Sequence, residues 1–264
     1  MGDALRARDV MSPRIATTTE DASLPSVVRT LEAGDFTAAL VLDAAGRAVG
    51  VVSFTDVLRS GNFVVSTGTD RPTLDDTPVT VKDVMTSPVL TVKEDDDFLD
   101  AVRILVGQRV HRVYVTRDGA PVGAVTTRDV LKIAVERHIE TPISEFMSSP
   151  AETIDLGESI DAALTQLQTT NVRGLVVVDG TMPIGVFTQR EAIRARGLPA
   201  AFRVQAVEQV MSYETICYDE KTPLYRAAGA MASMSTRRIL ATRQRSLVGV
   251  LTGYDLARAL VTDS

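Results

Sequence analysis

A hydroxyl and a carboxylic acid three residues apart recur four times in this chain, each time just after a glycine. The motif reads Gly-x-x-(Ser/Thr)-x-x-(Asp/Glu), and its polar members are Ser53 and Asp56, Thr126 and Asp129, Thr188 and Glu191, and Thr252 and Asp255. A carboxylate accepts two hydrogen bonds and is therefore matched to the paired hydroxyl groups of a ribose. The same spacing also forms a helix cap, in which both side chains satisfy N–H groups of the helix that they begin. Duplication would copy a cap as faithfully as a binding site, so the motif alone leaves both interpretations open.

Basic residues precede three of the four motifs, at the start of an apolar segment. They are His111 with Arg112, Arg173, and Arg237 with Arg238, and the first copy has Thr37 at the same position. Charged side chains are poor core material and have to reach solvent or an anion. If these basic residues lie opposite acids that bind a ribose, the arrangement predicts a site for a nucleotide phosphate. Arginines solvated at the surface are the alternative.

Four copies of one structural unit position these residues. Each copy begins with a methionine followed by a hydroxyl, which is Ser12, Thr86, Ser148 or Ser212. Thirteen residues after each methionine, an apolar pattern with the spacing i, i+3, i+4, i+7 begins at Leu24, Phe98, Ile160 or Leu224. That spacing predicts an amphipathic helix. A β-rich run, a turn, the motif and a second helical segment follow, so each copy predicts the order strand, helix, strand, strand, helix.

The repeats predict four domains, at residues 1–65, 66–138 (a linker and the second repeat), 139–200 and 201–264. Each is close to the smallest size that folds alone, so each is expected to pair with a neighbour and bury its sheet. Chain order suggests that repeat 1 pairs with repeat 2 and repeat 3 with repeat 4, joined near residues 137–143. Residues 60–80 are rich in Gly, Thr, Asp and Pro and are predicted to form a surface loop.

Composition excludes several classes of protein. One cysteine and two histidines provide neither a disulfide framework nor a structural zinc site, and no metal is expected. The net charge of -6 and the lack of a basic block argue against a nucleic-acid partner. No apolar run reaches the ~18 residues of a membrane helix, and the first ten residues lack a signal-peptide core. The sequence is therefore expected to be cytoplasmic and without a membrane partner.

As a set, these motifs resemble four tandem CBS domains arranged as two CBS pairs, or Bateman modules. The matching features are Val-Met-(Ser/Thr) at the repeat starts and Gly-x-x-(Ser/Thr)-x-x-Asp near the repeat ends. Residues 110–113 also resemble the His-Arg element in the gamma subunit of AMP-activated protein kinase, whose architecture the chain resembles. The resemblance implies an α/β (α+β) fold with two pseudo-twofold modules. It also implies a cleft in each pair for AMP, ADP, ATP or S-adenosylmethionine as a regulatory ligand, with no cofactor required.

The resemblance implies roles for the residues that match its motifs. The hydroxyls after the methionines are implied to lie near the base or ribose, the acids Asp56, Asp129 and Asp255 to hold the ribose, and the basic residues to face phosphate. Ser53, Thr126 and Thr252 are implied to lie beside the acids.

This sequence departs from the family pattern in three of the four copies. Glu191, beside Thr188, displaces its carboxylate by one methylene and predicts a weak or empty site. Thr37 and Ala38 remove a phosphate contact from repeat 1. Tyr254 is expected either to stack on a base or to block the pocket. Repeats 4 and 2 therefore rank ahead of repeat 1, with repeat 3 last.

Two functions follow from these expectations. The first is a regulatory protein that senses an adenosyl ligand and transmits a conformational change to an unknown partner protein, and it is expected to form a homodimer through exposed helix faces. The alternative is a ligand-free scaffold of duplicated, dimerising modules. An enzyme is disfavoured, because the sequence has no nucleophile–base pair and no phosphate-binding Gly-x-x-x-x-Gly-Lys loop.

Overall fold

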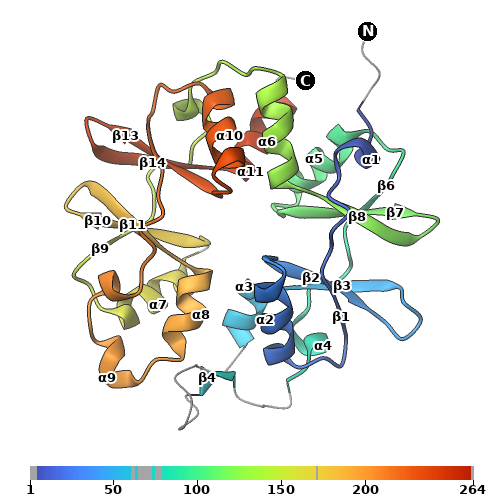
Figure 1. Cartoon of the computed structure of the whole chain (residues 1–264), viewed down its shortest axis with the longest axis horizontal. Coiled ribbons are helices and arrows are strands. Elements are labelled where there is room, and N and C mark those ends of the chain that lie inside the picture. Colours follow the sequence, from blue (N-terminus) through green and yellow to red (C-terminus); the bar gives the residue numbers. More distant parts are fainter. Residues whose placement is uncertain (1–4, 61–62, 65–72, 75–78, 171, 263–264) are drawn as a thin grey trace. The chain divides into compact units, whose positions relative to one another are not determined.

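The computed structural model describes residues 5–60, 63–64, 73–74, 79–170 and 172–262, and these contain four small αβ bodies (Figure 1). We call the segment from the first strand to the last helix of a repeat its body. In each body the first and second strands are parallel and the second and third are antiparallel. A helix makes the parallel connection and a tight turn makes the antiparallel one. The predicted order of elements and the α/β class are both confirmed.

The four bodies have matching elements. Body 1 contains β1 (Thr17–Thr19), α2 (Leu24–Ala33), β2 (Ala38–Leu42), β3 (Ala48–Ser53) and α3 (Phe54–Ser60). Body 2 contains β6 (Thr91–Lys93), α5 (Phe98–Gly107), β7 (Arg112–Arg117), β8 (Ala120–Thr126) and α6 (Thr127–Glu136). Body 3 contains β9 (Thr153–Asp155), α7 (Ile160–Thr169), β10 (Gly174–Asp179), β11 (Met182–Thr188) and α8 (Gln189–Arg196). Body 4 contains β12 (Cys217–Asp219), α10 (Leu224–Ser233), β13 (Arg238–Arg243), β14 (Ser246–Thr252) and α11 (Gly253–Thr262).

The first helix of each body begins at the residue that opens the apolar pattern. Ser23 and Ser159 cap α2 and α7 by accepting hydrogen bonds from backbone N–H groups, and Asp97 caps α5 in the same way. These caps satisfy donors that have no partner inside the helix. The apolar stripe then faces inward, so that all four opening residues are buried. The second helices begin earlier than the sequence indicated, directly after the hydroxyl of the motif.

Segments that carry the methionines precede the bodies, and we call them start segments (residues 5–15, 79–88, 139–151 and 204–214). They contain α1 (Ala7–Val10), α4 (Val81–Val84) and two 3-10 turns, Ile143–Glu145 and Val207–Gln209. Each start segment pairs with the third strand of the adjacent repeat in the chain. Ser12 exchanges two backbone hydrogen bonds with Ala124 of β8, and Thr86 exchanges two with Val51 of β3. Ser148 pairs in the same way with Val250 of β14, and Ser212 with Val186 of β11.

The motif glycines make room for these exchanged segments. A Cβ atom on Gly123 would lie 2.7 Å from the Met11 sulfur and 2.8 Å from the Ser12 carbonyl oxygen. Gly185 has the same relation to Met211 and Ser212, with both distances at 2.7 Å. Because heavy atoms cannot approach so closely, a residue with a side chain would push the start segment off the sheet. The repeated methionine of each start segment therefore packs directly against the repeated glycine of a motif.

The chain divides into two compact units, each containing two bodies and two start segments. Unit 1 comprises Met1–Ile15, Val89–Ala151 and Thr215–Ser264, and unit 2 comprises Ala16–Pro88 and Glu152–Glu214. Body 2 thus shares a unit with body 4, and body 1 with body 3. Pairing in chain order, which the sequence suggests, holds for the exchange of start segments, whereas the compact units group the bodies differently. A stripe of apolar residues shows which face of a helix is buried, but it does not identify the helix that covers it.

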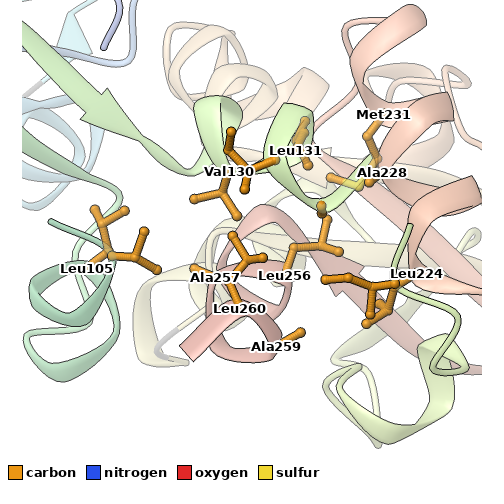
Figure 2. Close-up of a cluster of buried hydrophobic side chains, with 14 of the residues drawn as sticks. Leu105, Val130, Leu131, Leu224, Ala228, Met231, Leu256, Ala257, Ala259 and Leu260 are labelled. Atoms are coloured by element: carbon orange, nitrogen blue, oxygen red, sulfur yellow. The ribbon is translucent and has the colours of Figure 1, made fainter. Parts of the chain in front are cut away.

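Unit 1 is held together by helix packing around α6. Figure 2 shows side chains from α6, α10 and α11 in contact, among them Val130, Leu131, Ala228, Met231, Leu256 and Leu260. All six are less than one-tenth exposed. Ala7 and Ile143 bring two start segments into the same core. In unit 2 an equivalent cluster joins bodies 1 and 3.

Most of the loop predicted at residues 60–80 lies outside the described residues. Within it, β4 (Phe63–Val64) and β5 (Thr73–Leu74) form a short antiparallel pair. The short helix α9 (Ala200–Arg203) follows body 3. Among the residues that the structure describes, no helix combines the length and apolar character needed to span a membrane.

We predict that Gly123→Ala destabilises the protein by about 1 to 3 kcal/mol, because the added methyl group meets a backbone oxygen that cannot move aside easily. Chemical denaturation measures this change in the free energy of unfolding. Gly107→Ala is the matched control, since a Cβ atom there has no neighbour within 4 Å and alanine favours the helix. Equal stability of the two variants would contradict the close-contact explanation.

Candidate functional site

The hydroxyl–acid motifs form helix caps in all four bodies. Thr126 donates to the Asp129 carboxylate through its backbone N–H at 2.8 Å and through its hydroxyl at 2.7 Å. Thr252 and Asp255 make the same two contacts at 2.7 and 2.8 Å. Ser53 with Asp56, and Thr188 with Glu191, repeat the arrangement. The capping interpretation is therefore confirmed. Any binding of a ligand by these acids has to use the carboxylate oxygen that accepts no capping hydrogen bond.

The caps use one oxygen of each carboxylate. In Asp129 and Asp255 both capping hydrogen bonds end on Oδ2. The Oδ1 atom of Asp255 lies 3.7 Å from a guanidinium nitrogen of Arg258. A carboxylate oxygen has two lone pairs, so a capped acid retains acceptor capacity for a ribose hydroxyl.

The strand that begins with the basic residues lies directly beside each motif. In the antiparallel pairing of β7 with β8, Arg112 is opposite Thr126, and Arg238 is opposite Thr252 in β13 and β14. The His111 carbonyl also accepts a hydrogen bond from Thr127 N at 3.2 Å, which ties it to the first residue of α6. Cross-strand neighbours in such pairs have Cβ atoms about 5 Å apart. The basic residues and the capped acids therefore meet at one edge of the sheet in body 2 and in body 4.

The hydroxyl of a start segment completes each group. Ser12 pairs with Ala124, which precedes Thr126 by two residues, or about 7 Å of strand. The exchange of start segments decides which predicted residues meet. The four groups are Ser12, His111, Arg112, Thr126 and Asp129; Ser148, Arg237, Arg238, Thr252 and Asp255; Thr86, Thr37, Ser53 and Asp56; and Ser212, Arg173, Thr188 and Glu191.

The two groups of unit 1 differ from those of unit 2 in burial. Asp129 and Asp255 are 5% and 1% exposed, whereas Asp56 and Glu191 are only partly buried. Burial raises the pKa of Asp129 and of Asp255, because a desolvated carboxylate is less stable than the neutral acid. The capping hydrogen bonds oppose this rise with a smaller effect. The basic residues are more accessible, since Arg173 and Arg237 are exposed and His111 is half-buried.

Tyr114 is a candidate that the sequence analysis missed. It lies on the same face of β7 as Arg112, two residues along the strand. Its side chain is buried, and its hydroxyl has no hydrogen-bond partner among the described residues. Burial raises the pKa of this phenol, and the nearby Arg112 guanidinium opposes the rise. The available signal was a polar aromatic residue at a position where the other bodies have Leu40, Val176 and Leu240.

Tyr254 makes a contact between bodies that its sequence position did not predict. Its hydroxyl donates to the Val106 carbonyl at 2.9 Å, at the end of α5 in body 2. Its ring is tilted by 48° against the His111 imidazole, with the ring centroids 6.2 Å apart. The side chain therefore links body 4 to body 2. For metals, the described residues contain no group of three His, Cys, Asp or Glu side chains arranged to bind an ion.

We predict opposite pH dependences for two caps with the same hydrogen bonds. Because the pKa of Asp129 is raised on folding, its protonated form favours the folded state, and this contribution is lost as pH rises through the raised pKa. Asp129→Asn stays neutral and keeps an acceptor oxygen. Its free energy of unfolding, relative to the unsubstituted protein, should therefore increase between about pH 4 and pH 7 in denaturant titrations.

Asp83 in α4 provides the control, since it accepts the same two hydrogen bonds from Thr80 but is exposed. Those hydrogen bonds lower the pKa of Asp83, so its charged form stabilises the fold above the ordinary pKa. Asp83→Asn should therefore lose stability relative to the unsubstituted protein as pH rises. A change of the same sign in both variants would show that burial does not govern Asp129.

Comparison with known proteins agrees with this architecture. The CBS-domain family model matches residues 7–61, 81–136, 143–197 and 207–262. The crystal structure of MJ1225 from Methanocaldococcus jannaschii, described as a proposed archaeal homologue of the gamma subunit of AMP-activated protein kinase, superposes with a TM-score of 0.81 at 16% identity. That superposition covers 97% of this chain and 100% of MJ1225. A conserved protein from Pyrococcus horikoshii superposes with a TM-score of 0.68 at 21% identity over the same shares of the two chains. At these identities the likeness concerns the fold.

Among curated sequences, the protein MJ1404 of Methanocaldococcus jannaschii is 27% identical over 187 residues, which is 65% of this chain and 42% of MJ1404. The chain spans less than half the length of the first curated relatives that it matches. The family match, by contrast, extends over most of this chain and coincides with its four bodies and start segments. The chain belongs to the CBS-domain family and contains four CBS domains.

Proposed function

We propose that this chain is a regulatory protein that binds an adenosyl ligand, such as AMP, ADP, ATP or S-adenosylmethionine, beside its capped acids. The observation that carries the proposal is the convergence of a hydroxyl, a capped carboxylate and basic side chains at one sheet edge in body 2 and again in body 4. A ribose needs acceptors for paired hydroxyls, and a phosphate needs cationic donors. The pairing of the second and third strands brings both kinds of group to the same sheet edge.

The site in body 2 has the strongest support. It combines Ser12, His111, Arg112 and Asp129, and the buried Tyr114 hydroxyl lies on the same sheet face as Arg112. A buried donor without a partner is costly, and a ligand acceptor would relieve that cost. The site in body 4 ranks with it through Asp255, Arg237 and Arg238. Body 1 has Thr37 where the other bodies have a basic residue, and body 3 has Glu191 where the other bodies have an aspartate.

Binding would act on a partner protein, because we propose no catalytic role for this chain. A ligand changes the population of two arrangements only by its difference in affinity for them, typically 1 to 3 kcal/mol. A homodimer through exposed helix faces remains part of the proposal. The scaffold alternative is favoured by one observation, which is that the cap alone accounts for the contacts seen at each hydroxyl–acid pair.

Calorimetric titration with AMP, ADP, ATP and S-adenosylmethionine tests the proposal. We expect Asp129→Ala and Asp255→Ala each to remove one binding site, and Arg112→Ala to weaken ligands that carry a phosphate more than S-adenosylmethionine. Each acid variant should also lose about 1 kcal/mol of stability, because a cap is lost.

Asp83→Ala is the control, because it removes a cap of the same geometry in a start segment, outside the four candidate groups. It should keep every binding site. If none of the four compounds at millimolar concentration produces heat or raises the melting temperature, the scaffold function replaces this one.

A further inference from the structure

The two residues inside each hydroxyl–acid motif serve a different purpose from its ends. The ends, such as Thr252 and Asp255, form the cap. Between them, Gly253 packs on body 2, since a Cβ atom there would lie 2.8 Å from the Thr127 carbonyl oxygen and 2.9 Å from Thr127 Cβ. Thr127 itself lies inside the motif of body 2, directly after the capping Thr126. The first turns of α11 and α6 are therefore in direct contact.

Tyr254 extends this contact to the basic edge of body 2. Its hydrogen bond reaches the Val106 carbonyl at the end of α5, which also accepts from Arg109 N. The chain then continues through four residues to His111, and the Tyr254 ring lies against that imidazole. Both the hydroxyl and the ring of Tyr254 therefore contact body 2.

Unit 2 has the same joint with different chemistry. Gln189 and Arg190 occupy the motif positions of Gly253 and Tyr254. The Gln189 side-chain amide donates to the Thr55 hydroxyl at 2.8 Å, and Arg190 forms an ion pair with Asp35 at 2.8 Å. Like Thr127, Thr55 lies inside a motif, and Asp35 lies just after the first helix of its body, near the position that Val106 has at the end of α5. Two unrelated pairs of residues therefore make the same connection between bodies.

We propose that the candidate sites of bodies 2 and 4 are energetically coupled through Gly253 and Tyr254, with Tyr254 as the positioning residue. This inference rests on the proposed function, because the coupled events are ligand binding beside Asp255 and beside Asp129. A ligand that fixes the first turn of α11 also fixes Thr127 and the segment that leads to His111. The second ligand then meets a more ordered site, so the coupling is positive. Linkage makes the effect reciprocal.

The experiment restricts ligand binding to the candidate sites of unit 1 while keeping the full-length chain. Asp56→Ala with Glu191→Ala removes the candidate acids of unit 2, and AMP and ATP are then titrated by calorimetry. We expect two binding steps, the second tighter than independent sites allow by about fivefold or more. Tyr254→Phe, which keeps the ring but loses the hydrogen bond, should weaken the coupling with the circular dichroism spectrum unchanged.

Tyr213→Phe is the matched control, since it removes the hydroxyl of an exposed tyrosine that donates to Glu208 in unit 2. It should leave the coupling intact. Independent steps before substitution, or the same coupling in Tyr254→Phe, would overturn this inference while the proposed function stands. Absence of any binding of AMP, ADP, ATP or S-adenosylmethionine to the unsubstituted chain would overturn both.

A second measurement remains available if Tyr254→Phe proves unstable. The chain has two histidines, so imidazole proton signals can be assigned by single substitutions. In a chain with Asp129→Ala, AMP bound beside Asp255 should still shift the His111 signals. Signals of His111 that stay fixed while calorimetry shows AMP binding to that variant would contradict the coupling.

Discussion

The contact between a start segment and the motif glycine beneath it is the constraint on which the rest of the structure depends. At Gly123 the Met11 sulfur and the Ser12 carbonyl occupy the space that a side chain would need. The backbone hydrogen bonds between Ser12 and Ala124 can form only at this separation. Because the same arrangement recurs in all four repeats, each candidate site is assembled from two repeats, with the start-segment hydroxyl held beside a neighbour's capped acid.

The cap and the candidate site share one carboxylate, and the contact between bodies beside it accounts for how deeply that carboxylate is buried. A helix needs an acceptor at its first turn, and a ribose needs one in the same place. In unit 1 the acids are nearly inaccessible because α6 and α11 meet at their first turns, through Gly253 and Thr127. In unit 2 the joint is made by longer side chains, Gln189 and Arg190, and the acids there are partly exposed. The closeness of the joint thus sets how strongly each carboxylate is desolvated.

The interior residues of the motif show how a four-residue segment can have two functions. The end residues of the motif form the cap, and the two middle residues contact the other body. A candidate binding group therefore lies next to an interface between bodies. The candidate binding group and the interface are therefore covalently bonded neighbours in the chain. The departure from the family pattern at Gly253 and Tyr254 belongs to this joint.

The sequence by itself determined the repeat, the order of elements and the starts of the first helices, because amphipathic spacing and capping residues act over a few neighbouring positions. It also identified the hydroxyls, acids and basic residues that meet at the sheet edges. Only the tertiary structure decided that body 2 shares a core with body 4 and that Ser12 joins the group around Asp129. It alone revealed the buried Tyr114 hydroxyl as a member of the site face and Tyr254 as a link between bodies. These features depend on contacts between residues far apart in the chain, and a local pattern shows that a surface is to be covered without specifying what covers it.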